Sequence, residues 1–146
     1  MTRRVVVDAS VLVKWFVPEE FSDKAEAILN DHLDARVAVA APSYALLELA
    51  NALRKYVVRG VMGPGEAGEA FSLLLEMDVE FVEVDGELAR EALGYAIDNG
   101  VTVYDAYYIV LARRLGTVFY TADEKLLRQL RGREPVARHV SEYGPP

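Results

Sequence analysis

Short β-branched runs alternate with helical patterns along this chain. The expected strands cover residues 4–7, 37–40, 80–84, 117–120 and 136–140. Each run is short and bounded by turn or cap residues, as buried strands are. Strands that are separated by helices pair in parallel through crossovers. The pattern therefore predicts an α/β fold, a three-layer α/β/α sandwich around a central, mostly parallel sheet.

Helical patterns fill the intervals between these strands. They cover residues 9–16, 21–33, 42–59, 65–77, 86–99 and 104–115, and a short helix follows Thr121. Pro42 suits the first turn of the third helix, and Gly60 suits a left-handed cap just after it. Gly100 predicts a similar helix end. The apolar stripe of the third helix consists of Leu46, Leu49, Ala50, Leu53 and Val57.

Composition limits the chemistry of the chain. Its 146 residues are 52% hydrophobic, which fits one domain over residues 1–146. There is no cysteine, so disulfides, cysteine zinc sites and thiol nucleophiles are excluded, and only His32 and His139 offer imidazoles. Polar chemistry must rest mainly on carboxylates. The apolar runs are too short to span a membrane and the start lacks a signal-peptide pattern, so we expect a cytoplasmic protein.

The net charge of −7 argues at first against a nucleic-acid partner. Acidic residues are nevertheless concentrated between Gly60 and Asp98, which contain ten acids and one base. Basic residues gather elsewhere, among them Arg54, Lys55 and Arg59. Folding could unite them into a face for a polyanion, or they could simply form a solvated surface.

A glycine motif at residues 63–68 matches G-x-G-x-x-G but is not interpreted as a dinucleotide site. Such a loop follows a strand, whereas this one follows a helix end. Glu66 would also lie where a pyrophosphate binds. The segment is expected to be a turn between helices.

Two aspartates stand where a strand gives way to a helix. Asp8 closes the first strand, and Asp123 follows the strand that ends near Tyr120. Aspartate in this position is commonly a helix cap, and Thr121 with Glu124 resembles a capping box. In a parallel sheet the same positions lie at the carboxyl ends of strands, where functional sites form. Both interpretations stay open for each aspartate.

Two further acids lie in helices. Asp105 is the one charged residue between Val101 and Ala112, in a helix that is apolar nearly all round and therefore buried. Its place in the first turn, with Thr102 as a shared cap, suits either a structural carboxylate or a metal ligand. Glu48 lies opposite the apolar stripe of its own helix, so periodicity alone makes it a surface residue.

Four segments together resemble the ordered motifs of PIN-domain ribonucleases. They are VVVDASVLV at 5–13, LLELANAL at 46–53, TVYDAYYIVLA at 102–112 and TAD at 121–123. The likeness covers nearly the whole chain and is greatest to the small VapC-type toxins of toxin-antitoxin pairs. It implies an Mg²⁺- or Mn²⁺-dependent endoribonuclease with a metal site formed by Asp8, Glu48, Asp105 and Asp123, supported by Ser10 and Thr121.

The resemblance also implies partners. These are an RNA substrate, a VapB-like antitoxin whose C-terminal segment blocks the site, and a second copy of the chain in a homodimer. Trp15 and Phe16 could contribute to an exposed apolar groove, or they could pack inside the monomer.

The chemistry of clustered carboxylates agrees with a metal site. Acids held close together repel one another, which raises at least one pKa and favours a hard cation bound by oxygen. Our hypothesis is that Asp8, Glu48 and Asp105 hold the principal ion, while Asp123 serves a second ion or orients water. Basic residues that continue the Glu48 helix, and Lys125 and Arg128 after Asp123, are expected to flank a groove.

Other classes of protein share parts of this pattern. A haloacid-dehalogenase-like phosphatase needs a second acid two residues after the first, where this chain has Ser10. A receiver domain has an acidic pair near the first strand, whereas Asp8 stands alone. A non-catalytic PIN-like scaffold and an RNA-processing nuclease that is not a toxin both remain open.

Overall fold

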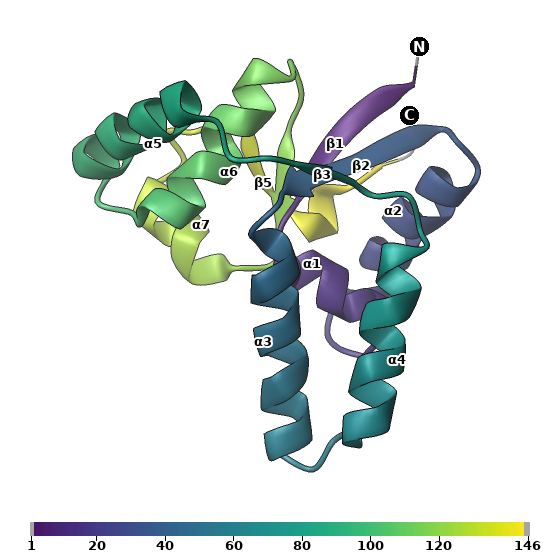
Figure 1. The fold of residues 1–146 in the computed structure, drawn as a ribbon. Helices are drawn as coiled ribbons and strands as arrows, with labels where there is room; N and C mark the ends of the chain where they lie inside the picture. The colour runs from purple at the N-terminus through teal and green to yellow at the C-terminus, as the bar shows by residue number, and fades with distance from the viewer. Residues whose placement is uncertain (1, 145–146) are drawn as a thin grey trace.

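A parallel five-stranded sheet forms the centre of the protein. The computed structural model describes residues 2–144, drawn in Figure 1. The strands are β1 (Arg3–Val7), β2 (Val37–Pro42), β3 (Glu80–Val82), β4 (Phe119–Thr121) and β5 (Ala137–His139). Their order is β3-β2-β1-β4-β5, and every pairing is parallel. The predicted parallel α/β sheet is confirmed.

Helices connect the strands as the sequence pattern predicts. They are α1 (Ala9–Leu12), α2 (Ser22–Leu33), α3 (Ala45–Val58), α4 (Pro64–Leu75), α5 (Gly86–Asn99), α6 (Val103–Arg114) and α7 (Glu124–Leu130), with the 3₁₀ turns η1 (Val13–Trp15) and η2 (Val140–Glu142). Gly60 and Gly100 both have left-handed backbones, at φ +76° and +65°, just past α3 and at the end of α5. These two predicted helix ends are confirmed.

One predicted boundary is wrong. Pro42 does not begin a helix: it is the last residue of β2 and lies opposite Val82 of β3. A proline at the end of a strand loses little, because the lost N–H is not needed beyond the ladder. The next residue, Ser43, donates its backbone N–H to the Val82 carbonyl at 2.8 Å, so α3 starts only at Ala45.

Alternation along β1 divides the interior into two apolar cores. Val5 and Val7 face a core shared with α1, α2, α3 and α4, whereas Val6 faces a second core shared with α5, α6 and α7. All three valines are fully buried, because helices cover both faces of the sheet. Figure 1 shows these two helical layers, so the three-layer sandwich is confirmed.

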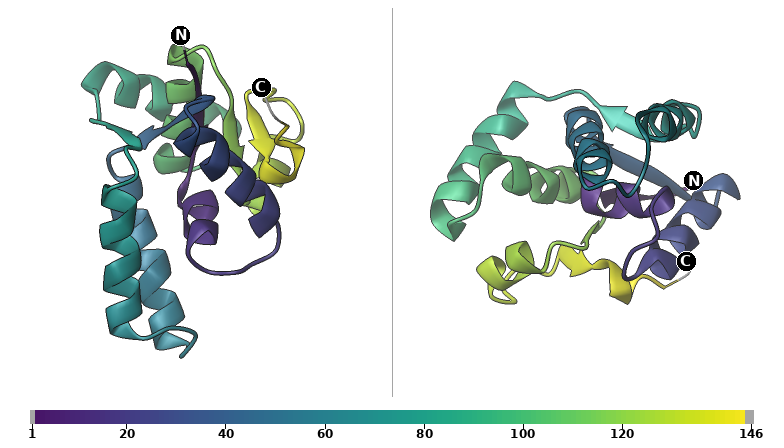
Figure 2. Two further views of the ribbon diagram at one scale, coloured as in Figure 1. Left: turned by 90° about the vertical axis from the view of Figure 1, so that its right-hand side faces the viewer. Right: turned by 90° about the horizontal axis from the view of Figure 1, so that it is seen from below.

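Helix α6 is the buried helix that its sequence predicts, because Ala106 to Ala112 are all buried. In contrast, α3 and α4 form a pair that extends away from the sheet (Figure 2). Trp15 and Phe16 pack against the first core, and the Trp15 indole donates to the Ala25 carbonyl at 2.8 Å. Across residues 2–144, no helix is both long and apolar enough to cross a membrane.

The sheet topology has its switch point between β1 and β4. From β1 the chain builds β2 and β3 on one side, and then returns to place β4 and β5 on the other. In open parallel sheets, ligands bind at the carboxyl ends of the strands on either side of such a reversal. Asp8 follows β1 directly, and Thr121 ends β4.

Candidate active site

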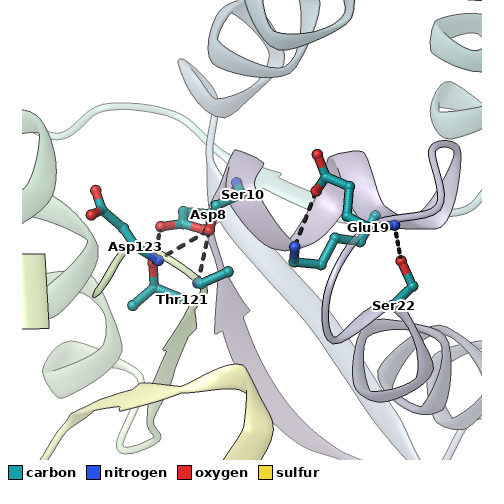
Figure 3. A network of polar contacts seen from close by, with 8 residues as sticks. Asp8, Ser10, Glu19, Ser22, Thr121 and Asp123 are labelled. Atoms are coloured by element: carbon teal, nitrogen blue, oxygen red, sulfur yellow. Dashed lines mark hydrogen bonds and ion pairs between the residues drawn. The ribbon is translucent and has the colours of Figure 1, made fainter. Parts of the chain in front are cut away.

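Asp8 lies at the carboxyl end of β1 and is only 8% exposed. It is the N-cap of α1, and its Oδ1 accepts from the Ser10 backbone N–H at 3.1 Å. The Ser10 hydroxyl donates to the same oxygen at 2.5 Å, and the Thr121 hydroxyl donates to Oδ2 at 2.5 Å. Figure 3 shows both hydroxyls turned toward this carboxylate. Asp8 is therefore a helix cap and also the centre of a polar cluster.

Ser10 and Thr121 connect the ends of the two central strands. The Ser10 hydroxyl accepts from the Ala122 backbone N–H at 2.9 Å, and the Thr121 hydroxyl accepts from the Asp123 backbone N–H at 3.0 Å. Each hydroxyl thus receives one hydrogen bond and donates another to Asp8. Both hydroxyls thus contact the Asp8 carboxylate, and their supporting role at a metal site, which the resemblance implies, stays a prediction.

Asp123 leads from the same strand end into α7. Its carboxylate caps that helix by accepting from the Leu126 backbone N–H at 3.1 Å. The predicted capping box of Thr121 and Glu124 is therefore wrong, because Thr121 still belongs to β4 and its hydroxyl is used by Asp8. The Asp123 side chain is exposed. In Figure 3 its carboxylate points away from Asp8.

Glu48 approaches from the first turn of α3. Periodicity alone placed it on the surface, but it is half-buried and its Oε1 accepts from the Tyr108 hydroxyl at 2.5 Å. Tyr108 comes from the middle of buried α6 and is only 1% exposed. Sequence reasoning counted Tyr108 as a core residue and missed this contact. The available signal was its hydroxyl, which needs a partner inside an apolar core.

Asp105 lies in the first turn of α6 and is half-buried. Its backbone N–H donates to the Thr102 hydroxyl at 3.1 Å, which confirms Thr102 as the cap of this helix. The cap thus uses the backbone of Asp105, as the sequence had allowed.

The electrostatics of Asp8 are those of a buried carboxylate that lacks a cation. Burial raises the pKa of Asp8 from 3.8 to about 7, although the hydrogen bonds from Ser10 and Thr121 oppose this rise. The charges of Glu48 and Asp105 raise it further. Among the ion pairs of residues 2–144, none includes Asp8. Negative charge at this position is therefore left uncompensated by the protein.

The same repulsion links the other three acids. Burial raises the pKa of Glu48, the Tyr108 hydrogen bond lowers it, and the charge of Asp105 raises it. Burial also raises the pKa of Asp105, and the charge of Asp123 adds to that rise while Thr102 opposes it. Each of the four acids therefore lies close enough to another for its charge to be felt.

The donor set fits a hard divalent cation. All four side chains offer carboxylate oxygens, which Mg²⁺ and Mn²⁺ prefer, and neither histidine belongs to the cluster. In residues 2–144 no three such side chains stand close enough together to hold one ion as they are now oriented. Asp8 and Glu48 are instead oriented by hydroxyl donors. An ion held by these carboxylates would also take water as ligands.

Comparison with known proteins shows the family of this chain. The model of the PIN domain family matches residues 5–132. The chain is homologous to Ribonuclease VapC3 of Pyrobaculum aerophilum, with 34% identity over 124 residues that cover 84% of this chain and 92% of the relative.

Solved structures share the fold. PAE2754 of Pyrobaculum aerophilum has a TM-score of 0.68 at 23% identity, over 97% of this chain and 92% of the other. VapC20 of Mycobacterium tuberculosis, described as a sarcin-ricin loop cleaving toxin, has a TM-score of 0.62 at 16% identity, over 81% and 87%. FitAcB of Neisseria gonorrhoeae has a TM-score of 0.62 at 13% identity, over 95% of this chain and 99% of the other. The family match spans most of the chain, which therefore belongs to the PIN domain family.

Proposed function

We propose that this protein is a divalent-metal-dependent endoribonuclease that hydrolyses RNA phosphodiester bonds. One observation carries the proposal: Asp8 is buried at the carboxyl end of β1 with two hydroxyl donors, the charges of Glu48 and Asp105 act on it, and within residues 2–144 it has no ion pair to a basic side chain. A fold that only needed a cap there would gain nothing from burying the charge. Descent from the same family as a ribonuclease supports the choice of RNA.

Each acid has a distinct place in the proposed chemistry. Asp8, Glu48 and Asp105 would hold the principal ion, and the more exposed Asp123 would serve a second ion or orient the attacking water. A bound Mg²⁺ or Mn²⁺ would supply Lewis acidity toward the phosphodiester and its leaving oxygen. Ser10 and Thr121 orient Asp8, and Tyr108 orients Glu48. No side chain then needs to act as a nucleophile.

The homology further supports a toxin role. We propose that the chain acts in a VapBC-type pair, with a VapB-like antitoxin that blocks the carboxylate site and with a homodimer as the active form. An RNA-processing nuclease that is not a toxin would use the same site. A non-catalytic scaffold would retain the fold without binding a cation.

The first test is a calorimetric titration with Mn²⁺. Wild type is compared with Asp8→Asn and Asp105→Asn, and Asp85→Asn serves as a control because Asp85 caps α5 outside the cluster. We expect binding by wild type and by the control, and none by the two cluster variants. Circular dichroism establishes that all four proteins are folded.

Cleavage completes the test. We expect the wild type to cut RNA only with the cation present and the Asp8→Asn variant to lose more than about 100-fold in rate, which exceeds the usual cost of removing a residue behind the ligands. A folded wild type that binds no Mn²⁺ would contradict the proposal and favour the scaffold.

A further inference from the structure

A pocket lies beside Ser10, the serine whose hydroxyl donates to Asp8. It has a volume of about 260 Å³ and lies between α1 with η1, helix α3 and the residue that follows β4. Its lining includes Ser10, Lys14, Glu19, Lys55, Arg59 and Ala122. The metal site proposed above uses none of the three basic residues, so the role of this pocket is still to be assigned.

The charge of this pocket is opposite to that of the chain as a whole. Three cationic side chains line it against one carboxylate, Glu19, in a protein of net charge −7. Lys55 and Arg59 are four residues apart on α3 and lie on one face of the helix. No acid occurs between Leu49 and Arg59. The local charge therefore attracts anions.

Lys14 contributes a fixed charge. It is only 8% exposed, and its Nζ lies 3.0 Å from Glu19 Oε1. The loop that carries Glu19 is held in turn, because the Glu19 backbone N–H donates to the Ser22 hydroxyl at 2.8 Å (Figure 3). A lysine is rarely buried unless it is paired, and solvent screens a buried charge less than an exposed one. Lys14 thus acts from the lining of the pocket, whereas Lys55 and Arg59 remain exposed above it.

The pocket shares a wall with the candidate active site. Ser10 and Ala122 belong to its lining, and they are joined by the hydrogen bond from the Ala122 N–H to the Ser10 hydroxyl. The same hydroxyl donates to Asp8. A group in the pocket would therefore be separated from the Asp8 carboxylate by one serine side chain.

We propose that this pocket binds the RNA backbone next to the bond that is cut, with Lys55 and Arg59 each contacting one phosphate. Arginine and lysine contacts to phosphate fix the register of a nucleic acid without reading its bases. Lys55 and Arg59 would thus be positioning residues that place the neighbouring phosphodiester over the acids. The proposal rests on the proposed ribonuclease function, which supplies the RNA.

The test measures RNA binding as a function of salt. A short fluorescent single-stranded RNA is bound to protein carrying Asp8→Asn, so that no cleavage disturbs the equilibrium. Into this background we introduce Lys55→Gln with Arg59→Gln. The control pair, Arg3→Gln with Arg90→Gln, removes the same charge from exposed residues that do not line this pocket.

We expect the pocket pair to weaken binding by about tenfold or more at moderate salt, and the control pair to have little effect. The slope of log affinity against log salt should fall by about 1.4 for the pocket pair, because each lost phosphate contact on a single strand contributes about 0.7. Equal losses in both pairs would overturn the proposal, since net charge alone would explain them. An unchanged slope in the pocket pair would overturn it too.

The pocket and the metal site can fail separately. With Asp8 intact, the Lys55→Gln and Arg59→Gln protein should bind Mn²⁺ as wild type does, because neither residue belongs to the carboxylate cluster. If wild type binds Mn²⁺ but the pocket pair of substitutions leaves the salt dependence of RNA binding unchanged, the pocket proposal fails and the nuclease proposal stands. If wild type binds no Mn²⁺, the nuclease proposal fails, and the RNA titration still decides the pocket.

Discussion

Two buried carboxylates in this protein are treated in opposite ways. Glu134 is 7% exposed and lies just before β5, and Asp8 is 8% exposed after β1. Glu134 accepts from the Tyr95 hydroxyl at 2.9 Å and from the Val136 N–H at 3.2 Å, and it also pairs with the Arg113 guanidinium. Asp8 has hydroxyl donors too, but its charged neighbours are acids.

The difference separates a structural acid from a functional one. A buried charge is expensive unless it is paired, and the fold meets that cost at Glu134 with Arg113. At Asp8 no basic side chain within residues 2–144 offsets the free-energy cost of burying the ionised carboxylate, and the charges of Glu48 and Asp105 increase that cost. Burial alone therefore does not mark a site. An unpaired charge among like charges does, because a cation from outside relieves it.

The largest expected effect is a difference between Glu134→Gln and Asp8→Asn in metal-free stability at neutral to alkaline pH. Glu134→Gln should lower the free energy of unfolding by about 2 to 4 kcal/mol, because it breaks a buried pair. Asp8→Asn should leave it unchanged or raise it, because the buried charge is removed. Urea unfolding with a chelator present measures both. The exposed Glu91→Gln controls for net charge, and equal losses at Glu134 and Asp8 would break the comparison.

The second effect is a dependence of stability on pH. The pKa of Asp8 is about 7 in the folded protein and 3.8 in the unfolded chain. Between these pH values Asp8 is therefore protonated in the folded protein and ionised in the unfolded chain. Asp8 therefore favours the metal-free fold at low pH, and this contribution disappears as the pH rises through 7. Between about pH 5 and pH 8 the free energy of unfolding of the wild type should fall by about 2 to 3 kcal/mol more than that of the Asp8→Asn variant.

Metal binding should show the opposite trend with pH. Mn²⁺ needs the ionised carboxylate, so its affinity should fall as the pH drops below about 7, and binding should release protons. Calorimetry in buffers of different ionisation heat would reveal the release. A flat pH response in both experiments would mean that Asp8 resembles Glu134 after all.

The third effect concerns the orientation of Glu48. Tyr108→Phe removes the hydroxyl that donates to Glu48 and keeps the ring in the core. Mn²⁺ affinity should fall by about 10- to 100-fold, as is usual when a residue that orients a metal ligand is lost. Tyr107→Phe is the matched control, because its hydroxyl accepts from the Asp85 N–H instead. Equal titrations for the two variants would remove Tyr108 from the site.

The smallest expected effect is that of Ser10→Ala. The change removes one donor to Asp8 and leaves the Ala122 N–H without its acceptor, so unfolding should become easier by about 1 kcal/mol. The pKa of Asp8 should rise further, and the pH midpoint of Mn²⁺ binding should rise with it. Ser72→Ala, exposed on α4, is the control. An unchanged midpoint would show that Ser10 does not tune Asp8.

Local signals predicted most of the fold. The apolar runs gave the five strands, and Gly60, Gly100 and Thr102 marked helix ends that the structure confirms. These features depend on neighbours in the chain, so they can be inferred without knowing the fold. The error at Pro42 arose because the same backbone angle suits both the first turn of a helix and the end of a strand.

The nonlocal features were harder to predict. Periodicity put Glu48 on the surface, since nothing in α3 itself indicates that α6 brings Tyr108 against it. The family resemblance raised Glu48 to a site residue, and its role as a metal ligand stays a proposal. The pairing of Lys14 with Glu19 had no signal in the sequence, whereas the basic residues after Glu48 already suggested that a groove lies beside this helix.

Sequence alone established the alternation of strands and helices, the helix caps and the dependence of any polar chemistry on carboxylates, because these follow from local patterns and residue types. Tertiary structure decided which acids share a charged neighbourhood and which are neutralised. Residues 8, 48, 105 and 123 are far apart along the chain, and the topology of the sheet sets which strand ends and helix starts approach one another. That approach brings the charge of each acid to bear on another, because electrostatic energy depends on distance and burial rather than on sequence separation.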